Sequence, residues 1–229
     1  MRLDTLDWNH DADGRSAAGP PALALALFDR EDERLLAACL AELGQGRARR
    51  VAEGLLERFG SLSGVFGAST EAQQATAGMT VAAAEGLRRV HTLAVRLARA
   101  EIAPGAVISS WTALLAYVGV ALRHERREQF RVLFLDVRNC LIRDETLGVG
   151  TVDHAPVYPR EVIRRALELC ASNLILVHNH PGGDPTPSRA DIDITKQVID
   201  AGRLLKIAVH DHLVVGREGV ASFKSLGLI

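Results

Sequence analysis

Two histidines, a serine and an aspartate stand close together in one short stretch of the sequence. His178 and His180 are separated by a single residue and end the apolar run 174–177. Alternate side chains of a strand point to the same face, so both imidazoles can converge on one ion. Seven residues separate His180 from Ser188, and two more separate Ser188 from Asp191. Two histidines and one carboxylate form a hydrolytic zinc site whose fourth position is open for water.

Ser188 and Asp191 also fit a purely structural role. Serine at the N-cap of a helix with an acid three residues later resembles a capping box, and the positive end of the helix favours the carboxylate there. The preceding loop, 179–187, holds three prolines and two glycines, so it is stiff yet able to turn sharply. Taken alone the pair favours a cap, whereas together with the two histidines it favours a metal site.

The elements that must position these residues alternate between strand and helix after Pro104 and Gly105. Strands are predicted over 130–136, 174–177 and 204–215, the last broken at 210–212, and helices over 111–122, 160–171 and 189–201. This alternation indicates an α/β or α+β domain over residues 104–229.

The preceding residues have a different character. Residues 21–103 are rich in Ala, Leu, Arg and Glu, and apolar residues recur at helical spacing over 51–59 and 87–97. Gly60 is placed to end the first of these helices. We therefore expect a small all-helical domain over 21–103, preceded by a disordered tail over 1–20.

Composition limits the class of protein. The chain has 27 basic and 28 acidic residues, and this net charge of −1 argues against nucleic-acid binding by bulk electrostatics. Its longest apolar run, 22–28, is too short to span a membrane, and the Asp-rich start lacks the apolar core of an export signal. The three cysteines form no Cys-x-x-Cys pair, which argues against disulfides. We expect a cytoplasmic protein without a membrane partner.

The combined spacing resembles the JAMM (MPN-plus) metalloprotease motif and, more narrowly, the bacterial RadC family. The narrower resemblance rests on His-Asn-His-Pro-Gly-Gly at 178–183, Pro-Ser-Arg-Ala-Asp at 187–191, Val-Leu-Phe-Leu-Asp at 132–136, Gly150-Thr151, Pro-Arg-Glu at 159–161 and Asp211-His212. It implies a JAMM/MPN domain, cytidine deaminase-like, with a mixed sheet flanked by helices.

The resemblance also implies a chemistry, the hydrolysis of amide bonds in a peptide or protein substrate. One zinc ion would be held by His178, His180 and Asp191, and Ser188 would support the tetrahedral intermediate. A glutamate on an early strand would act as general base. The substrate itself cannot be inferred from a motif.

The identity of that glutamate is left open by the sequence. Glu128 stands two residues before Phe130 and shares its strand parity, which matches the glutamate at the start of the family's strand. Glu125 and Glu145 are the rivals, although both stand in charged or loop-like surroundings. Glu128 also follows two arginines, so a surface ion pair is its alternative role.

Residues 210–212 provide a second His-x-His pattern. We expect His210 and His212 to support the ligands by hydrogen bonds rather than to bind a second metal, because the segment has too few carboxylates. The His-Glu-x-x-His zinc motif is absent.

The helical part resembles the RadC N-terminal domain loosely, chiefly through residues 55–62. That family usually has a helix-hairpin-helix turn with two glycines that bind DNA phosphate, and the corresponding stretch 77–80 has one glycine. Residues 21–103 hold ten basic and ten acidic residues, so DNA binding is expected to be weak and mainly non-specific. The alternative to a hydrolase is a DNA-associated accessory protein with a structural or vestigial metal site.

Overall fold

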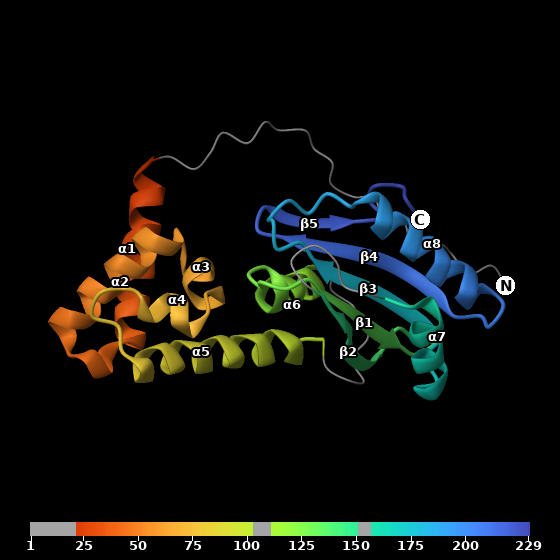
Figure 1. The fold of residues 1–229 in the computed structure, drawn as a ribbon, viewed down its shortest axis with the longest axis horizontal. Helices are drawn as coiled ribbons and strands as arrows, with labels where there is room; N and C mark the ends of the chain where they lie inside the picture. Colours follow the sequence, from red (N-terminus) through yellow and green to blue (C-terminus); the bar gives the residue numbers. More distant parts are fainter. Residues whose placement is uncertain (1–21, 103–110, 151–156) are drawn as a thin grey trace.

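The computed structural model describes residues 22–102, 111–150 and 157–229. Figure 1 shows a helical part on the left and, on the right, a sheet with helices packed against it. The predicted tail over 1–20 and the junction at Pro104 and Gly105 lie outside the described residues, as does Thr151 of the family resemblance.

Helices alone form the described N-terminal part, which confirms the all-helical prediction. They are α1 (Ala22–Cys39), the 3-10 helix η1 (Ala41–Leu43), α2 (Gln45–Phe59), α3 (Leu62–Gly67), α4 (Thr70–Gln74) and α5 (Val81–Ala100). Helix α2 ends as predicted at Gly60, whose φ of 79° is the left-handed conformation that glycine adopts readily. Leu36, Leu40, Leu55 and Leu87 are fully buried in a core of their own.

Five strands form one sheet with the order β2-β1-β3-β4-β5. They are β1 (Gln129–Leu135), β2 (Leu141–Val149), β3 (Asn173–Asn179), β4 (Ala208–Gly216) and β5 (Gly219–Ser222). Only β3 and β4 pair in parallel, and the other neighbours are antiparallel. The predicted mixed sheet flanked by helices is therefore confirmed.

Helices cover both faces of this sheet. Helix α6 (Trp111–Leu122) packs on the face formed by the odd-numbered residues of β3, such as Ile175 and Val177. Helices α7 (Pro159–Glu168) and α8 (Arg189–Arg203) lie together on the opposite face, over Leu174 and Leu176 (Figure 1). Because side chains alternate along a strand, His178 points to the side of α7 and α8.

The prediction of a strand over 204–215 that is broken at 210–212 is wrong in two respects. The strand begins later than predicted, and it is not broken. Helix α8 continues to Arg203, and β4 runs unbroken from Ala208 through the polar segment to Gly216. The irregularity there is a β-bulge, since Leu174 pairs with Val209 while the next residue, Ile175, pairs with Asp211. The pairing of β4 with β3 therefore continues past the bulge, and the bulge changes only the directions in which the side chains of β4 point.

Helix α7 ends at Glu168, three residues before the predicted end at Ala171, and Cys170 adopts a left-handed φ of 53° after it. All three cysteines are free, as expected. None of the helices in the described ranges has the length and apolar character that crossing a membrane requires.

Candidate metal centre

The two histidines lie where β3 ends, beside its neighbours β1 and β4. His178 pairs with Phe130 of β1, and its side chain is buried with 1% exposure. The backbone N–H of His180 donates to the Val215 carbonyl at 2.9 Å, which continues the parallel pairing beyond the strand. His180 is only half-buried, so the centre opens on its side.

The structure brings the three predicted ligands together. The Nε2 atoms of His178 and His180 lie 3.0 Å apart. Asp191 Oδ1 lies 3.2 Å from Nε2 of His178, and Oδ2 lies 3.4 Å from Nε2 of His180. Their ligand atoms all lie within 4.8 Å of one another, close enough to hold a single metal ion.

Ser188 and Asp191 serve the helix and the centre at once. The Asp191 N–H donates to Ser188 Oγ at 3.2 Å, and the Ser188 N–H donates to Asp191 Oδ2 at 2.7 Å, which completes a capping box at the start of α8. The two interpretations left by the sequence are therefore compatible. The cap holds the carboxylate in the orientation in which it faces both histidines.

A buried chain of hydrogen bonds determines the proton positions on His178. Thr195 Oγ1 donates its only proton to the Asp191 carbonyl at 2.5 Å, so it must accept from Nδ1 of His212 at 2.6 Å. Burial lowers the pKa of His212 well below its ordinary value, and this neutral ring has only Nε2 left as an acceptor. Nδ1 of His178, 2.8 Å away, is then the donor, so in the neutral His178 ring Nε2 carries no proton.

His180 reaches the same state independently. Its Nδ1 lies 2.9 Å from the Asp184 carbonyl, which can only accept, so Nδ1 carries a proton and Nε2 of the neutral ring is bare. With both rings neutral, two imidazole lone pairs and two carboxylate oxygens converge, and these groups repel one another unless a positive charge lies between them. Neutral nitrogen and carboxylate donors are the ligands that zinc accepts, so the residues fit this ion.

The pKa shifts indicate the same preference for a positive charge. Burial raises the pKa of Asp191, but the hydrogen bonds with His178 and His180 and the charge of His178 outweigh it and hold that pKa well below its ordinary value. The pKa of His180 is raised, chiefly by its hydrogen bond with Asp191. Both shifts mean that the carboxylate and the imidazoles favour a positive charge, a proton or a metal ion, between them.

Of the three candidate glutamates, Glu128 lies beside the ligands. It directly precedes β1, and the antiparallel register, extended by two residues, sets it opposite His180. Its charge contributes to the raised pKa of His180. Glu145 instead pairs with Val132 further along the sheet.

Glu145 is also occupied by an ion pair, because Arg165 of α7 donates to its two oxygens at 2.5 and 2.7 Å. The side chain of Glu125 is exposed, and its carbonyl accepts from Asn179 Nδ2 at 3.2 Å. Neither rival is brought to the three ligands.

The expectation that His210 and His212 support the ligands by hydrogen bonds is confirmed for His212 and is wrong for His210. His212 supports His178 from behind, whereas Nε2 of His210 lies 2.7 Å from Asn139 Oδ1 at the other end of β4. The Asp211 carboxylate accepts from Ser222 Oγ at 2.5 Å and from the Lys224 N–H at 3.0 Å. The β-bulge makes His210 an extra residue, so the two histidines do not act together.

Sequence reasoning missed Thr195 and Asp184, which orient the two imidazoles. Thr195 lies four residues after Asp191 on α8, one helical turn away, and its side chain is fully buried. This four-residue spacing is visible in the sequence, but only the tertiary packing shows that His212 lies against Thr195.

The fold and this centre agree with a comparison to protein families. A family model described as a RadC-like JAB domain matches residues 108–228. The chain belongs to the RadC family. The matched RadC-like segment contains the whole sheet and all three ligands, whereas the helical part lies outside it. The helix-hairpin-helix and cytidine deaminase-like resemblances stay predictions.

Proposed function

We propose that this RadC-family chain is a zinc-dependent hydrolase of amide bonds, in peptide or isopeptide linkage. The observation that carries the proposal is the convergence of bare Nε2 atoms and the Asp191 carboxylate in a half-open centre. His178, His180 and Asp191 would hold the ion. When bound, zinc supplies Lewis acidity, which lowers the pKa of water and polarises a carbonyl.

Glu128 is the proposed general base. A carboxylate on the His180 side can accept a proton from the attacking water and return it to the leaving amine. Its half-buried place at the start of β1 and its influence on the pKa of His180 support this role. Glu145 is a poorer base, because the hydrogen bond from Arg165 lowers its pKa.

Ser188 is proposed to stabilise the oxyanion that forms during amide hydrolysis. Its Oγ accepts the Asp191 N–H through a lone pair, which leaves the hydroxyl proton available. The described residues offer this proton no acceptor, so it can donate to an oxygen that becomes negative during the reaction.

A matched pair of glutamate variants tests the proposal. The zinc-loaded full chain is screened against a peptide library, and Glu128→Gln and Glu145→Gln are compared on any peptide that is cleaved. We expect Glu128→Gln to retain zinc and lose about 100-fold or more in kcat, because general base catalysis contributes about that much. Glu145→Gln should retain most activity. Equal activities of the two variants would move the base elsewhere.

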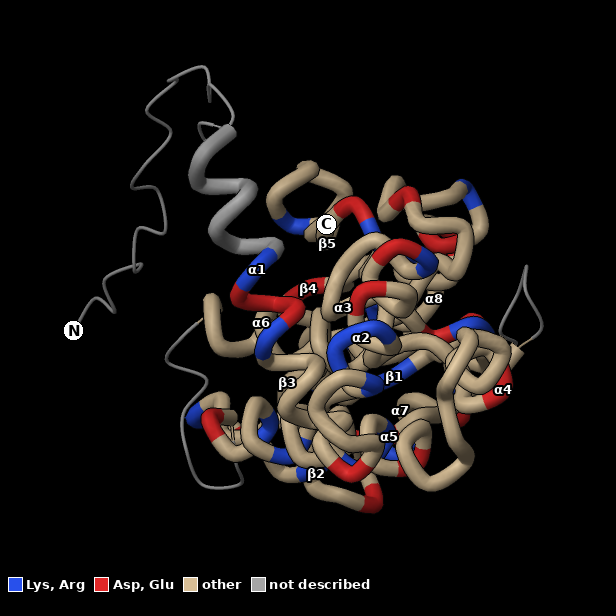
Figure 2. Tube along the Cα trace, turned by 90° about the vertical axis from the view of Figure 1, so that its left-hand side faces the viewer, with Lys and Arg blue, Asp and Glu red and all other residues tan. Residues whose placement is uncertain are grey.

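The alternative, a DNA-associated accessory protein with a structural metal site, predicts no cleavage by the zinc-loaded chain. It also predicts tight binding of duplex DNA, but residues 21–103 have no excess of basic over acidic residues to bind the phosphates. Figure 2, viewed from the end that this part forms, shows Lys and Arg interspersed with Asp and Glu. A Kd tighter than about micromolar for a mixed duplex at physiological salt would favour this alternative.

A further inference from the structure

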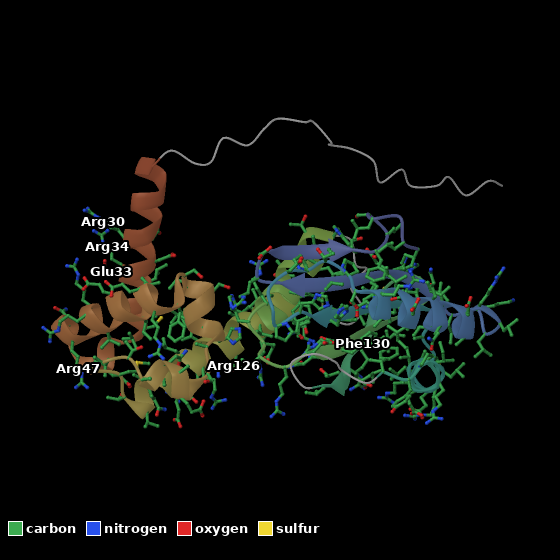
Figure 3. The ribbon with its side chains drawn as sticks, turned by 45° about the horizontal axis from the view of Figure 1, so that its top comes forward. Arg30, Glu33, Arg34, Arg47, Arg126 and Phe130 are labelled. Atoms are coloured by element: carbon green, nitrogen blue, oxygen red, sulfur yellow. The ribbon has the colours of Figure 1, made fainter. Side chains whose placement is uncertain are left out.

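A cleft lies where the helical part meets the loop between α6 and β1. Two adjoining hollows of about 440 and 290 Å³ share the residues 67–68 and 124–126. Figure 3 labels Arg126 at this junction. The two parts are held here by a contact of Ser63 Oγ with His124 Nε2 at 2.7 Å and of His91 Nε2 with the Val120 carbonyl at 3.0 Å.

The cleft is strongly positive in a chain that is nearly neutral. Its arginines come from helices and loops of both parts and are Arg58, Arg88, Arg123, Arg126, Arg127 and Arg217. Glu125 is the single acidic residue among the lining residues that the structure describes. The rest of the chain is left with 21 of the 27 basic and 27 of the 28 acidic residues, so this arginine cleft opposes the overall charge.

No carboxylate of the described ranges forms an ion pair with these six arginines. Arg217 donates to the Gly182 carbonyl at 2.7 Å, and the Arg58 guanidinium lies over the Phe59 ring. The buried Nε of Arg123 has no described hydrogen-bond partner. The pKa of His124 is lowered, first by burial and then by the charges of Arg123 and Arg217, as expected in a positive potential.

Two segments of the chain lead directly from the arginine cleft to the metal centre. Pro181, which lines it, directly follows the ligand His180, and Arg217 holds the carbonyl of the next residue in the same loop. Arg126 and Arg127 directly precede Glu128. A chain lying in the cleft would therefore continue past the proposed base and the open side of the centre.

We propose that the arginine cleft binds an acidic segment of the polypeptide substrate next to the scissile bond, an inference that rests on the proposed hydrolase function. Guanidinium groups bind carboxylates through paired hydrogen bonds, and six of them that form no ion pair with a described carboxylate favour a run of Asp or Glu, although the charge of Glu71 acts on Arg126. Hollows of this size admit a few residues of extended chain, at about 3.3 Å per residue.

Single-stranded nucleic acid is the less suitable occupant. Proteins that bind it combine basic grooves with aromatic rings on which bases stack. Among the described lining residues the large aromatic rings are those of Phe59 and Phe66, and both pack against the core of the helical part. The rings of His91 and His124 are engaged in the contacts that join the two parts. The Phe59 ring also has the Arg58 guanidinium over it.

Fluorescence anisotropy of labelled peptides tests the proposal in the full-length Glu128→Gln chain, which leaves peptide uncleaved. The probes are a Glu-Gly alternating decapeptide, its Gln-Gly analogue and a single-stranded oligonucleotide of equal charge. Arg88→Gln with Arg126→Gln removes two exposed cleft charges. Arg160→Gln with Arg203→Gln removes two exposed charges elsewhere and is the matched control.

We expect the Glu peptide to bind more tightly than the Gln peptide, with an affinity that falls as salt increases. The cleft variant should lose about tenfold in affinity and the control less than about twofold. Equal binding of the two peptides, or equal losses in the two variants, would overturn the proposal. Tighter binding of the oligonucleotide with the same arginine dependence would assign the cleft to nucleic acid instead. Cleavage by the unmutated chain is scored separately, so the hydrolase and the cleft can fail independently.

Discussion

The two ends of the same sheet each hold a polar cluster with a histidine, and the clusters differ in how their hydrogen-bond acceptors are satisfied. At the end where β3 stops, the Nε2 atoms of His178 and His180 and the Asp191 carboxylate face one another, and with neutral rings no proton lies between them. At the other end, Asn139 Oδ1 accepts from Asn173 Nδ2 at 3.0 Å and lies 2.7 Å from Nε2 of His210.

The comparison separates a binding site from a structural cluster on physical grounds. At the Asn139 end the shared acceptor, Asn139 Oδ1, meets donors supplied by the protein itself. At the His178 end the surplus of lone pairs is satisfied only by a cation. Both clusters contain residues of the His-x-His pattern at 210–212, which shows that residue type alone does not decide between these roles.

The largest expected effect is the loss of the metal on removing ligands at one end only. His178→Ala with His180→Ala should reduce bound zinc from about one ion per chain to almost none, because one carboxylate does not hold the ion. Elemental analysis of the purified chain measures this. His210→Ala is the matched control from the other end and should retain full zinc. Unchanged zinc in the double variant would show that the two histidines do not hold the metal.

A second variant tests whether the hydrogen bonds of Thr195 and His212 determine which nitrogen of His178 carries the proton. Thr195→Val preserves the shape of a fully buried residue but deprives His212 Nδ1 of its acceptor. We expect zinc affinity to fall about 10- to 100-fold, the usual cost of losing a residue that orients a ligand. Chelator competition measures the affinity, and nitrogen NMR of the metal-free chain should show Nδ1 of His178 no longer fully protonated.

Thr146→Val, on an exposed position of β2, is the control for that experiment. It should change neither the affinity nor the tautomer. If Thr195→Val binds zinc as tightly as the unmutated chain, the buried hydrogen-bond chain does not prepare His178 for the ion.

The structural cluster should respond in stability and not in metal content. Asn139→Ala removes the acceptor shared by Asn173 and His210 at a position with a φ of 62°, which alanine adopts at a cost. We expect the free energy of unfolding to fall by about 1–3 kcal/mol, with zinc unchanged. Urea denaturation with elemental analysis measures both. A loss of zinc would show that the two ends are coupled.

The smallest effect is expected between the two ends, at the ion pair of Glu145 with Arg165. The hydrogen bond from Arg165 lowers the pKa of Glu145 below its ordinary 4.5. The folded state thus gains stability above that pH and loses it as the pH falls through the lowered value. Glu145→Gln should cost up to about 1 kcal/mol near neutral pH, because the pair is partly exposed, and little in acid. Denaturation at several pH values measures it, and a gap that widens in acid would contradict the assignment.

The features of this protein that depend on neighbouring residues could be predicted from its sequence. The capping pattern of Ser188 and Asp191, the strand-end histidines and the glycine that ends α2 are set by neighbours in the chain, so short-range physics was enough to predict them. Apolar periodicity likewise predicted an all-helical part followed by alternating strands and helices.

Which distant residues complete the centre depends on the packing of the whole domain. The register of β1 with β3, extended two residues beyond the Phe130–His178 pair, directs Glu128 toward His180, whereas Glu145 pairs with Arg165, and this register depends on contacts between strands that are distant in the sequence. The β-bulge in β4 separated His210 from His212, and the packing of α8 brought Thr195 to His212. Which nitrogen of His178 carries the proton depends on the hydrogen bonds of Thr195 and His212, because each hydrogen bond determines which atom can donate in the next.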